Sequence, residues 1–345
     1  MKKVVILLFI VMVGLGSCIK NFENEFPDYD ITTGYFPYQF PVRTIILGDY
    51  IYDNSNDNAH KFLISAHMGG VYKNKKDRKF SIEVDNSLCN DILSVRSGDT
   101  IAIQAMPSNY YTLSSSELII PKDYYIGGVE VQLSEAFFDD PLAITRTYVV
   151  PVRLKSSNDV DSLLSGFSYL ANPDERFTDQ WEALMAPKNF TMFAVKFVNE
   201  YHGAYLHYGK CIVNDNGVKV EEATYEAMYV EQNPIVNVNT TLRRQVSANL
   251  TLRSNTLSGI ISILLNFDNN DNCTIVEAPG SVRQVSGSGK FESKKWRFGN
   301  KDRDGITLNF TVTDGPITYV AEDVLVLRSR DIVMETYTPV LSSGQ

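Results

Sequence analysis

A two-residue alternation of apolar and polar side chains is the feature that most constrains the fold of this chain. It is cleanest at residues 306–313, where Ile, Leu, Phe and Val alternate with Thr and Asn, and it recurs at residues 80–84 and 129–133. Side chains of a β-strand point alternately to opposite faces, so this period predicts half-buried strands with one face on a core.

Runs of this kind continue from Gly34 towards the C-terminus and predict an all-β protein of two domains. About seven short strands within residues 34–199 predict a β-sandwich. No helical stretch separates the strands in residues 200–345, so we expect an antiparallel barrel or a second sandwich there. The pair Asn216-Gly217 predicts a two-residue hairpin between two of these strands.

Residues 156–188 depart from the alternation and are expected to form a long connection. Short helical turns are predicted at residues 161–164 and 174–185, the second one preceded by the capping-type Thr178 and ended by Pro187. A connection of this length inside a compact domain is often functional.

The first eighteen residues have the pattern of an export and anchoring signal. Two lysines precede an apolar run at residues 4–13, which is shorter than the roughly 20 residues of a membrane-spanning helix. Leu-Gly-Ser before Cys18 resembles a bacterial lipobox, which implies that residues 1–17 are a signal peptide and that Cys18 carries acyl chains. Residues 18–33 would then be a lipidated tether. The alternative is an ordinary buried cysteine after a hydrophobic strand.

The charge of the chain limits its partners. The formal net charge is -9, and removal of residues 1–17, with their two lysines, makes it -11. An acidic protein is a poor ligand for nucleic acid and for anionic lipid surfaces, so the acyl chains are the expected membrane contact. The three remaining cysteines are far apart in sequence and odd in number, and we expect them to be buried free thiols: Cys89, Cys211 and Cys273.

Two stretches near the N-terminus carry a family resemblance. GYFPYQFPVRTIILG at residues 34–48 and GGVYKNKKDR at residues 69–78 resemble the N-terminal domain of a large family of Bacteroidetes outer-membrane lipoproteins, which are encoded mainly in polysaccharide-utilisation systems. The resemblance extends over residues 34–199 and implies an immunoglobulin-like β-sandwich. Residues 201–205 (YHGAY) and 328–331 (RSRD) are similar to the lipocalin-like or sandwich domains that follow it in that family.

The resemblance implies a protein anchored in the outer membrane by lipid, at its surface or its periplasmic face. Such a protein binds glycan and presents it to a neighbouring outer-membrane transporter or hydrolase. The family supplies no motif that identifies a ligand contact.

Aromatic side chains are the candidates for sugar contacts, because the C–H faces of a sugar stack on rings while its hydroxyls need hydrogen bonds. The same rings commonly fill β-cores, so each candidate is also a possible core residue. Trp181 lies in the long polar connection, and Trp296 lies between two lysines and an arginine. Tyr110 and Tyr125 belong to adjacent tyrosine pairs, in which one ring of a strand should face outward.

Motifs for metal binding or catalysis are weak. The acidic loop at residues 268–272 places oxygen side chains at alternate positions, as calcium loops do, but it lacks the acidic ligand downstream and a solvated turn is the simpler interpretation. His202 and His207 are five residues apart and would point to opposite faces of a strand. The sequence GSGK at residues 287–290 lacks the first glycine of a phosphate loop and is expected to form a turn. No cofactor, metal or catalytic residue is predicted.

Three functions remain open. We expect a non-enzymatic envelope protein that binds a poly- or oligosaccharide for uptake or degradation. The alternative is a structural or assembly subunit that binds another envelope protein, and a glycoside hydrolase is a less favoured third. A groove lined by aromatic rings would favour the first, a flat apolar patch the second, and a cleft with two carboxylates the third.

Overall fold

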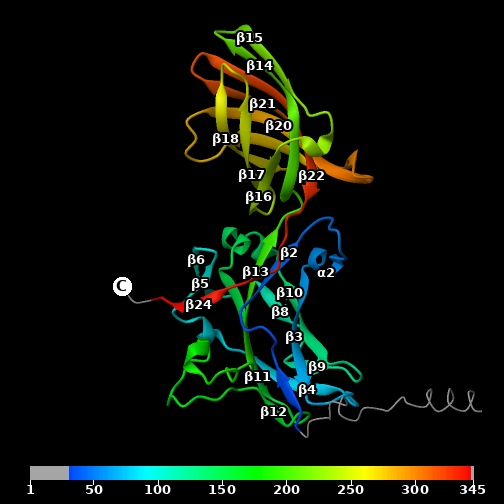
Figure 1. Cartoon of the computed structure of the whole chain (residues 1–345), viewed down its shortest axis with the longest axis vertical. Helices are drawn as coiled ribbons and strands as arrows, with labels where there is room; N and C mark the ends of the chain where they lie inside the picture. Colours follow the sequence, from blue (N-terminus) through cyan, green and yellow to red (C-terminus); the bar gives the residue numbers. More distant parts are fainter. Residues whose placement is uncertain (1–30, 343–345) are drawn as a thin grey trace, which may run out of the picture.

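The computed structural model describes residues 31–342 as two β-domains arranged along the long axis of the molecule (Figure 1). Strands make up 55% of the structure and helices 7%, which confirms the all-β prediction. The predicted signal peptide and Cys18 lie outside the described residues. Within residues 31–342, no helix has the length and apolar character needed to cross a membrane.

The N-terminal domain is built from one large sheet and a small one. The large sheet has the order β12-β1-β3-β10-β9-β4-β11-β13-β2-β23, with β7 on β11 and β8 on β10, and the small sheet has the order β24-β5-β6. Most pairs are antiparallel, but β1–β12, β7–β11 and β2–β13 are parallel. The strands before residue 200 are β1 (Thr33–Tyr35), β2 (Pro41–Ile46), β3 (Lys61–Gly69), β4 (Arg78–Val84), β5 (Ile92–Arg96), β6 (Asp99–Ala102), β7 (Gln104–Ala105), β8 (Tyr111–Leu113), β9 (Glu117–Ile120), β10 (Ile126–Leu133), β11 (Tyr148–Ser156), β12 (Ser162–Leu163) and β13 (Phe190–Val198).

The alternation of β3 shows how these sequences form a core. Phe62, Ile64, Ala66 and Met68 are buried, whereas the intervening Leu63 is 54% exposed. The inward side chains join one apolar cluster with those of β4, β9, β10, β11 and β13. One face of the strand therefore supplies the core, as its two-residue period predicts.

The helices of the described residues are single turns that connect strands. They are α2 (Ser55–Asn58), α3 (Glu135–Phe138) and the 3-10 turns η2 (Asn86–Cys89), η3 (Pro141–Ile144), η4 (Thr178–Gln180) and η5 (Val230–Gln232). The helical turn expected at residues 161–164 is wrong, because β12 there pairs in parallel with β1. Of the turn expected at residues 174–185, only η4 forms.

The C-terminal domain is a closed antiparallel barrel of eight strands, which decides between the two predicted alternatives. The sheet closes because β14 pairs with β16 on one side and with β22 on the other, and β15 extends it as a ninth strand on β14. Its strands are β14 (Gly203–Asp215), β15 (Val218–Tyr225), β16 (Ile235–Leu242), β17 (Gln245–Arg253), β18 (Ser258–Phe267), β19 (Asn272–Glu277), β20 (Gln284–Phe298), β21 (Lys301–Asp314) and β22 (Ile317–Ser329).

Two local predictions in the barrel have opposite outcomes. The hairpin at Asn216-Gly217 is confirmed, because both residues have positive φ, 48° and 80°, between β14 and β15. The turn predicted at residues 287–290 is wrong, because these residues lie inside β20. A Cβ on Gly287 would lie 2.6 Å from the Cβ of Phe310 on β21, so the glycine makes room for that side chain.

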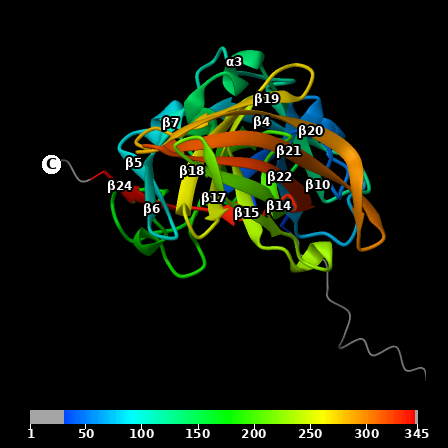
Figure 2. The same ribbon diagram turned by 90° about the horizontal axis from the view of Figure 1, so that it is seen from above.

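The chain crosses between the domains twice. After β13 it enters the barrel, and after β22 it returns as the red segment of Figure 1, which ends in β23 (Glu335–Thr336) on β2 and β24 (Thr338–Leu341) on β5. The range 200–345 expected for the C-terminal domain thus includes a terminal segment that pairs with the N-terminal domain. Figure 2, seen from above, shows the barrel strands over that domain and β24 beside β5 and β6.

Candidate functional site

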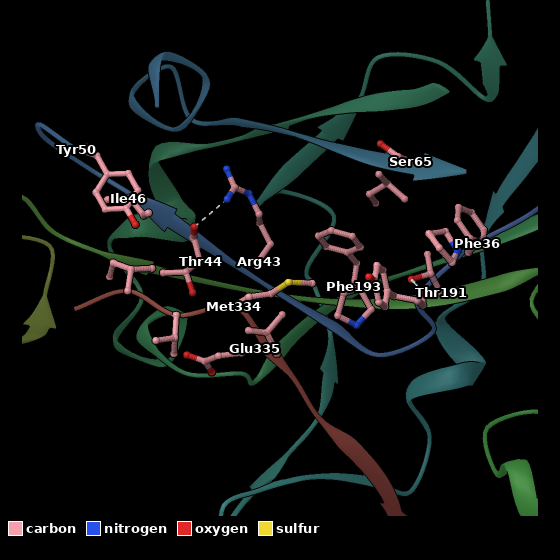
Figure 3. A pocket seen from close by; sticks show the side chains of 17 residues that line it. Phe36, Arg43, Thr44, Ile46, Tyr50, Ser65, Thr191, Phe193, Met334 and Glu335 are labelled. Atoms are coloured by element: carbon pink, nitrogen blue, oxygen red, sulfur yellow. Dashed lines mark hydrogen bonds between the residues drawn. The ribbon is translucent and has the colours of Figure 1, made fainter. Parts of the chain in front are cut away.

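A cavity of about 420 Å³ lies in the N-terminal domain where the returning segment passes over β2 (Figure 3). We call it the apolar cavity. Residues from four parts of the chain form it: the stretch around β1 and β2, strand β3, the start of β13, and residues 332–335. The residues that line it are Phe36, Pro37, Tyr38, Pro41, Val42, Arg43, Thr44, Ile46, Tyr50, Ile64, Ser65, Thr191, Phe193, Ile332, Val333, Met334 and Glu335.

Four aromatic rings line the apolar cavity. Phe36 is 1% exposed, and Phe193 is half-buried on β13 and stacks on Phe62 with ring centroids 5.5 Å apart. Tyr38 is 54% exposed, and Tyr50 is half-buried. The cavity therefore combines well-packed rings with one ring that is open to solvent.

Arg43 is the cationic group of the cavity and is held by a buried carboxylate. Its guanidinium donates to the Oδ1 of Asp57, which is 2% exposed, and to the carbonyl oxygen of Thr44 at 3.2 Å. Burial raises the pKa of Asp57, while the amide N–H of Ile46, 3.0 Å from Oδ2, and the charge of Arg43 act in the opposite direction. These contacts fix the position of Arg43 at the cavity wall (Figure 3).

Glu335 is the carboxylate of the cavity and comes from the returning segment. Its Oε1 lies 2.8 Å from the Nζ of Lys196, and its Oε2 lies 3.6 Å from the Nε of Arg96. Although the side chain is only 10% exposed, Oε2 has no hydrogen-bond donor among the described residues. Glu335 also borders a second cavity, of about 230 Å³, whose lining includes His202 and Asp331.

The apolar cavity has the properties of a small-molecule site. Its volume is within the range of about 300 to 1,000 Å³ that is usual for ligand pockets, and its lining is mainly apolar with a few fixed polar groups. Among residues 31–342 no group of three or more His, Cys, Asp or Glu side chains could hold a metal ion. Such a site suits a ligand with both apolar faces and hydroxyl groups.

The two tryptophans singled out from the sequence take part in packing. Trp181 is half-buried in the long connection, where its Nε1 donates to the carbonyl oxygen of Asp174 at 2.9 Å and its ring lies over Gly166. Trp296 is half-buried on β20, and its ring lies over Gly305 with the Nζ of Lys295 5.3 Å from the ring centroid.

The two tyrosines lie elsewhere in the N-terminal domain. Tyr110 donates to Asp140 Oδ2 at 2.8 Å and packs against the main core cluster. Tyr125, 39% exposed, donates to the carbonyl oxygen of Tyr72. The structure does not bring the four predicted residues together, and none of them lines the apolar cavity.

The residues that do line the cavity gave only an indirect sequence signal. Phe36 and Tyr38 belong to the segment that carries the family resemblance, whereas Phe193 lies in an apolar strand that predicts core. Residues 332–335 follow the barrel and gave no signal, because nothing local indicates that the chain returns to the first domain.

The predicted calcium-like loop and the histidines also have defined roles. Asp268 Oδ1 accepts the amide N–H groups of Asn270 at 2.7 Å and Asn272 at 3.0 Å, which favours the solvated turn. His202 Nδ1 accepts the amide N–H of Thr240 at 3.2 Å. His207 lies in the barrel interior with its Nε2 2.7 Å from Asp323 Oδ2. The three cysteines are free and buried, as predicted.

Comparisons with known proteins agree with this division of the chain. Residues 200–331 match a domain of unknown function, DUF5627, and residues 26–161 match a family described as an N-terminal domain. No curated protein matches the chain. The structure of an auxiliary nutrient binding protein from Bacteroides thetaiotaomicron is 11% identical, with 85% of this chain and 95% of that chain covered, and its TM-score of 0.39 is too low to indicate function.

A much stronger similarity is to the crystal structure of a Bacteroides ovatus protein of unknown function. The two are 34% identical with a TM-score of 0.83, and the match covers 91% of this chain and all of the other. The chain therefore belongs to the same family as this Bacteroides ovatus protein.

Proposed function

We propose that the protein binds an oligosaccharide in the apolar cavity and does not cleave it. The observation that carries the proposal is the set of rings at that cavity, with Tyr38 open to solvent and Phe193 and Tyr50 half-buried. Aromatic faces pack against the C–H faces of a pyranose ring, and Arg43 can donate to its hydroxyl oxygens.

The direct test is a glycan-array screen of the full chain purified in detergent, followed by calorimetry with any oligosaccharide that binds. Tyr38→Ala should weaken binding about fivefold or more, because stacking on an aromatic ring contributes on the order of 1 kcal/mol or more. Tyr124→Ala is the matched control, since Tyr124 is an equally exposed tyrosine, at 65%, that does not line the apolar cavity.

Two results would contradict the proposal. If Tyr38→Ala and Tyr124→Ala bind the oligosaccharide as tightly as the unchanged protein, the apolar cavity is not the site. If no saccharide binds, an envelope protein becomes the expected partner. Recovery of shortened oligosaccharide after incubation would instead support a hydrolase.

We further propose that the protein is anchored in the outer membrane through Cys18. The support is the lipobox-like sequence before Cys18 and the membership of the chain in a family with a Bacteroides member. Mass spectrometry of the N-terminal peptide should find a diacylglyceryl-modified Cys18, and Cys18→Ala should release the protein from the membrane fraction. An unmodified N-terminal peptide would rule the anchor out.

A further inference from the structure

A third cavity, of about 560 Å³, lies at the junction of the two domains, and we call it the junction cleft. It is formed by the loop after β2, the hairpin between β20 and β21, and the exit from β22. The residues that line it are Asp49, Tyr50, Ile51, Lys294, Lys301, Asp302, Arg303, Asp304, Leu327, Arg328, Ser329, Arg330, Asp331 and Ile332.

The lining of the junction cleft has five cationic side chains and four carboxylates. Among the described residues, no carboxylate lies within 4.0 Å of a charged nitrogen of Lys301, Arg303, Arg328 or Arg330, since none of these four takes part in an ion pair. The overall charge of the protein is -9, so this surplus of unpaired cations is a local property of the cleft.

Three of the four aspartates of the cleft are already engaged. Asp49 pairs with Lys294 at 2.8 Å, and Asp302 lies 3.8 Å from Arg297, which is outside the lining. Asp304 accepts the amide N–H of Lys294 and the hydroxyl of Ser293, both at 2.9 Å. The fourth, Asp331, is exposed. Asp304 keeps its negative charge in these hydrogen bonds, and its charge and that of Glu200 act on Arg330. The lining nevertheless carries five cationic side chains against four carboxylates.

Arg330 is the most deeply buried of these cations. It is 6% exposed, and its two terminal nitrogens donate to the carbonyl oxygens of Asp49 at 2.9 Å, Leu47 at 3.0 Å and Asn199 at 2.6 Å. Carbonyl dipoles hold the guanidinium but do not cancel its charge. Its Nε is buried and has no acceptor, which is costly for a donor on a charged group.

Arg303 repeats this feature in the same cleft. One terminal nitrogen donates to the carbonyl oxygen of Arg328 at 3.2 Å, and the guanidinium lies 4.4 Å from the ring centroid of Phe298. Its Nε, like that of Arg330, is buried without an acceptor. The Nε atoms themselves are closed to solvent, so an anion with several oxygens would contact the rest of the Arg303 guanidinium and the exposed side chains of Lys301 and Arg328. Charge-assisted bonds to such groups are strong and often paired.

The junction cleft and the apolar cavity have common walls. Tyr50 and Ile332 line both of them. A ligand with a neutral part in the apolar cavity can therefore extend past Tyr50 towards Arg303 and Arg330. The two cavities together provide rings for sugar faces at one end and cationic donors at the other.

We propose that the junction cleft binds the anionic group, a carboxylate or a sulfate ester, of an acidic saccharide whose neutral part occupies the apolar cavity. The inference rests on the proposed saccharide binding and names the class of ligand. Carboxylate and sulfate offer the same chemistry to a guanidinium, and the experiment below distinguishes them.

The test uses calorimetry on the full chain in detergent with two matched pairs of probes. One pair is an oligogalacturonate and its methyl ester, and the other is a kappa-carrageenan oligosaccharide, whose charges are all sulfate esters, and its desulfated form. The charged member of one pair should bind at least about tenfold more tightly than its neutralised partner, which is the expected effect of losing one charge-assisted contact. Binding of the charged member should also weaken between 50 and 300 mM salt.

Substitutions locate the effect. Arg303→Gln should weaken binding of the charged probe about tenfold and leave the neutralised probe unchanged, and Lys219→Gln, on the exposed face of β15 outside the cleft, is the matched control. If the melting curve shows that Arg303→Gln does not fold, the double variant of the exposed Lys301 and Arg328 to Gln should produce the same selective loss.

The outcomes separate this inference from the proposed function. Equal binding of charged and neutralised probes, unchanged by either set of substitutions, would overturn the junction-cleft proposal and leave saccharide binding in place. Absence of binding by any saccharide would overturn both. Stabilisation by inorganic sulfate alone, without saccharide binding, would also overturn the proposal, because the cleft would then be an anion site unrelated to sugars.

Discussion

Acidification should weaken the protein through His202, which lies at the domain junction. Its Nδ1 accepts the amide N–H of Thr240 at 3.2 Å. The pKa of His202 is lowered to about 4, mainly by burial and also by the nearby charges of Arg330 and Lys196, which the charge of Asp331 opposes. Protonation would remove the acceptor and place a new cation beside two existing ones.

The size and sign of the effect follow from this pKa. The usual value is 6.5, so the shift of about 2.5 units corresponds to about 3 kcal/mol of free energy of unfolding. The folded protein binds the proton less tightly than the unfolded chain does. The contribution is therefore complete above pH 6.5 and is lost progressively as the pH falls from 6.5 to about 4.

Denaturant unfolding at several pH values between 7.5 and 4 measures this loss. His202→Asn is the comparison, because the asparagine Oδ1 can accept from Thr240 but does not bind a proton in this range. Between pH 7 and pH 4 the unchanged protein should lose about 3 kcal/mol more than the variant. Parallel pH curves for the two proteins would refute the reasoning.

Three further predictions concern the interior. Asp323→Ala should lower the free energy of unfolding by about 3 to 5 kcal/mol, measured in denaturant, because it leaves His207 buried in the barrel without its partner at 2.7 Å. Burial raises the pKa of Cys89 and of Cys273 to about 12, so iodoacetamide at pH 8 should alkylate them only after unfolding, as intact mass spectra would show. Gly305→Ala should cost about 1 to 3 kcal/mol and lower the melting temperature, because its Cβ would lie 2.6 Å from the Trp296 ring and from a backbone carbonyl oxygen.

The barrel could be predicted from sequence wherever its strands carry apolar side chains at alternate positions. β21 is such a strand, and residues 306, 308, 310 and 312 are all buried. β20 could not be predicted in this way, because Gly287 and Gly289 interrupt its alternation where the β21 backbone lies close: an added Cβ would be 2.3 Å from the carbonyl oxygen of Asn309 and 2.4 Å from that of Thr307. β20 is therefore a strand because of its pairing with β21. The order of apolar and polar residues along β20 alone does not predict it.

The candidate site was beyond prediction for a different reason. The polar sequence around Trp181 and Trp296 predicts sugar contacts, yet each ring covers a glycine, Gly166 and Gly305, so that close packing half-buries it. A glycine facing a tryptophan across a turn or a strand pair is a long-range relation. Composition near the tryptophan gives no sign of it.

The returning segment lines both the apolar cavity and the junction cleft, through Ile332. Residues 332–335 reach the N-terminal domain only after the chain has completed the barrel, and Arg330 fixes their direction by donating to carbonyl oxygens of Leu47, Asp49 and Asn199. The apolar cavity therefore has a wall that depends on the barrel, and the junction cleft has a wall that depends on the N-terminal domain. A ligand that contacts both cavities would bind only when the two domains are folded and placed as they are here. Its binding free energy would therefore add to the stability of the domain junction.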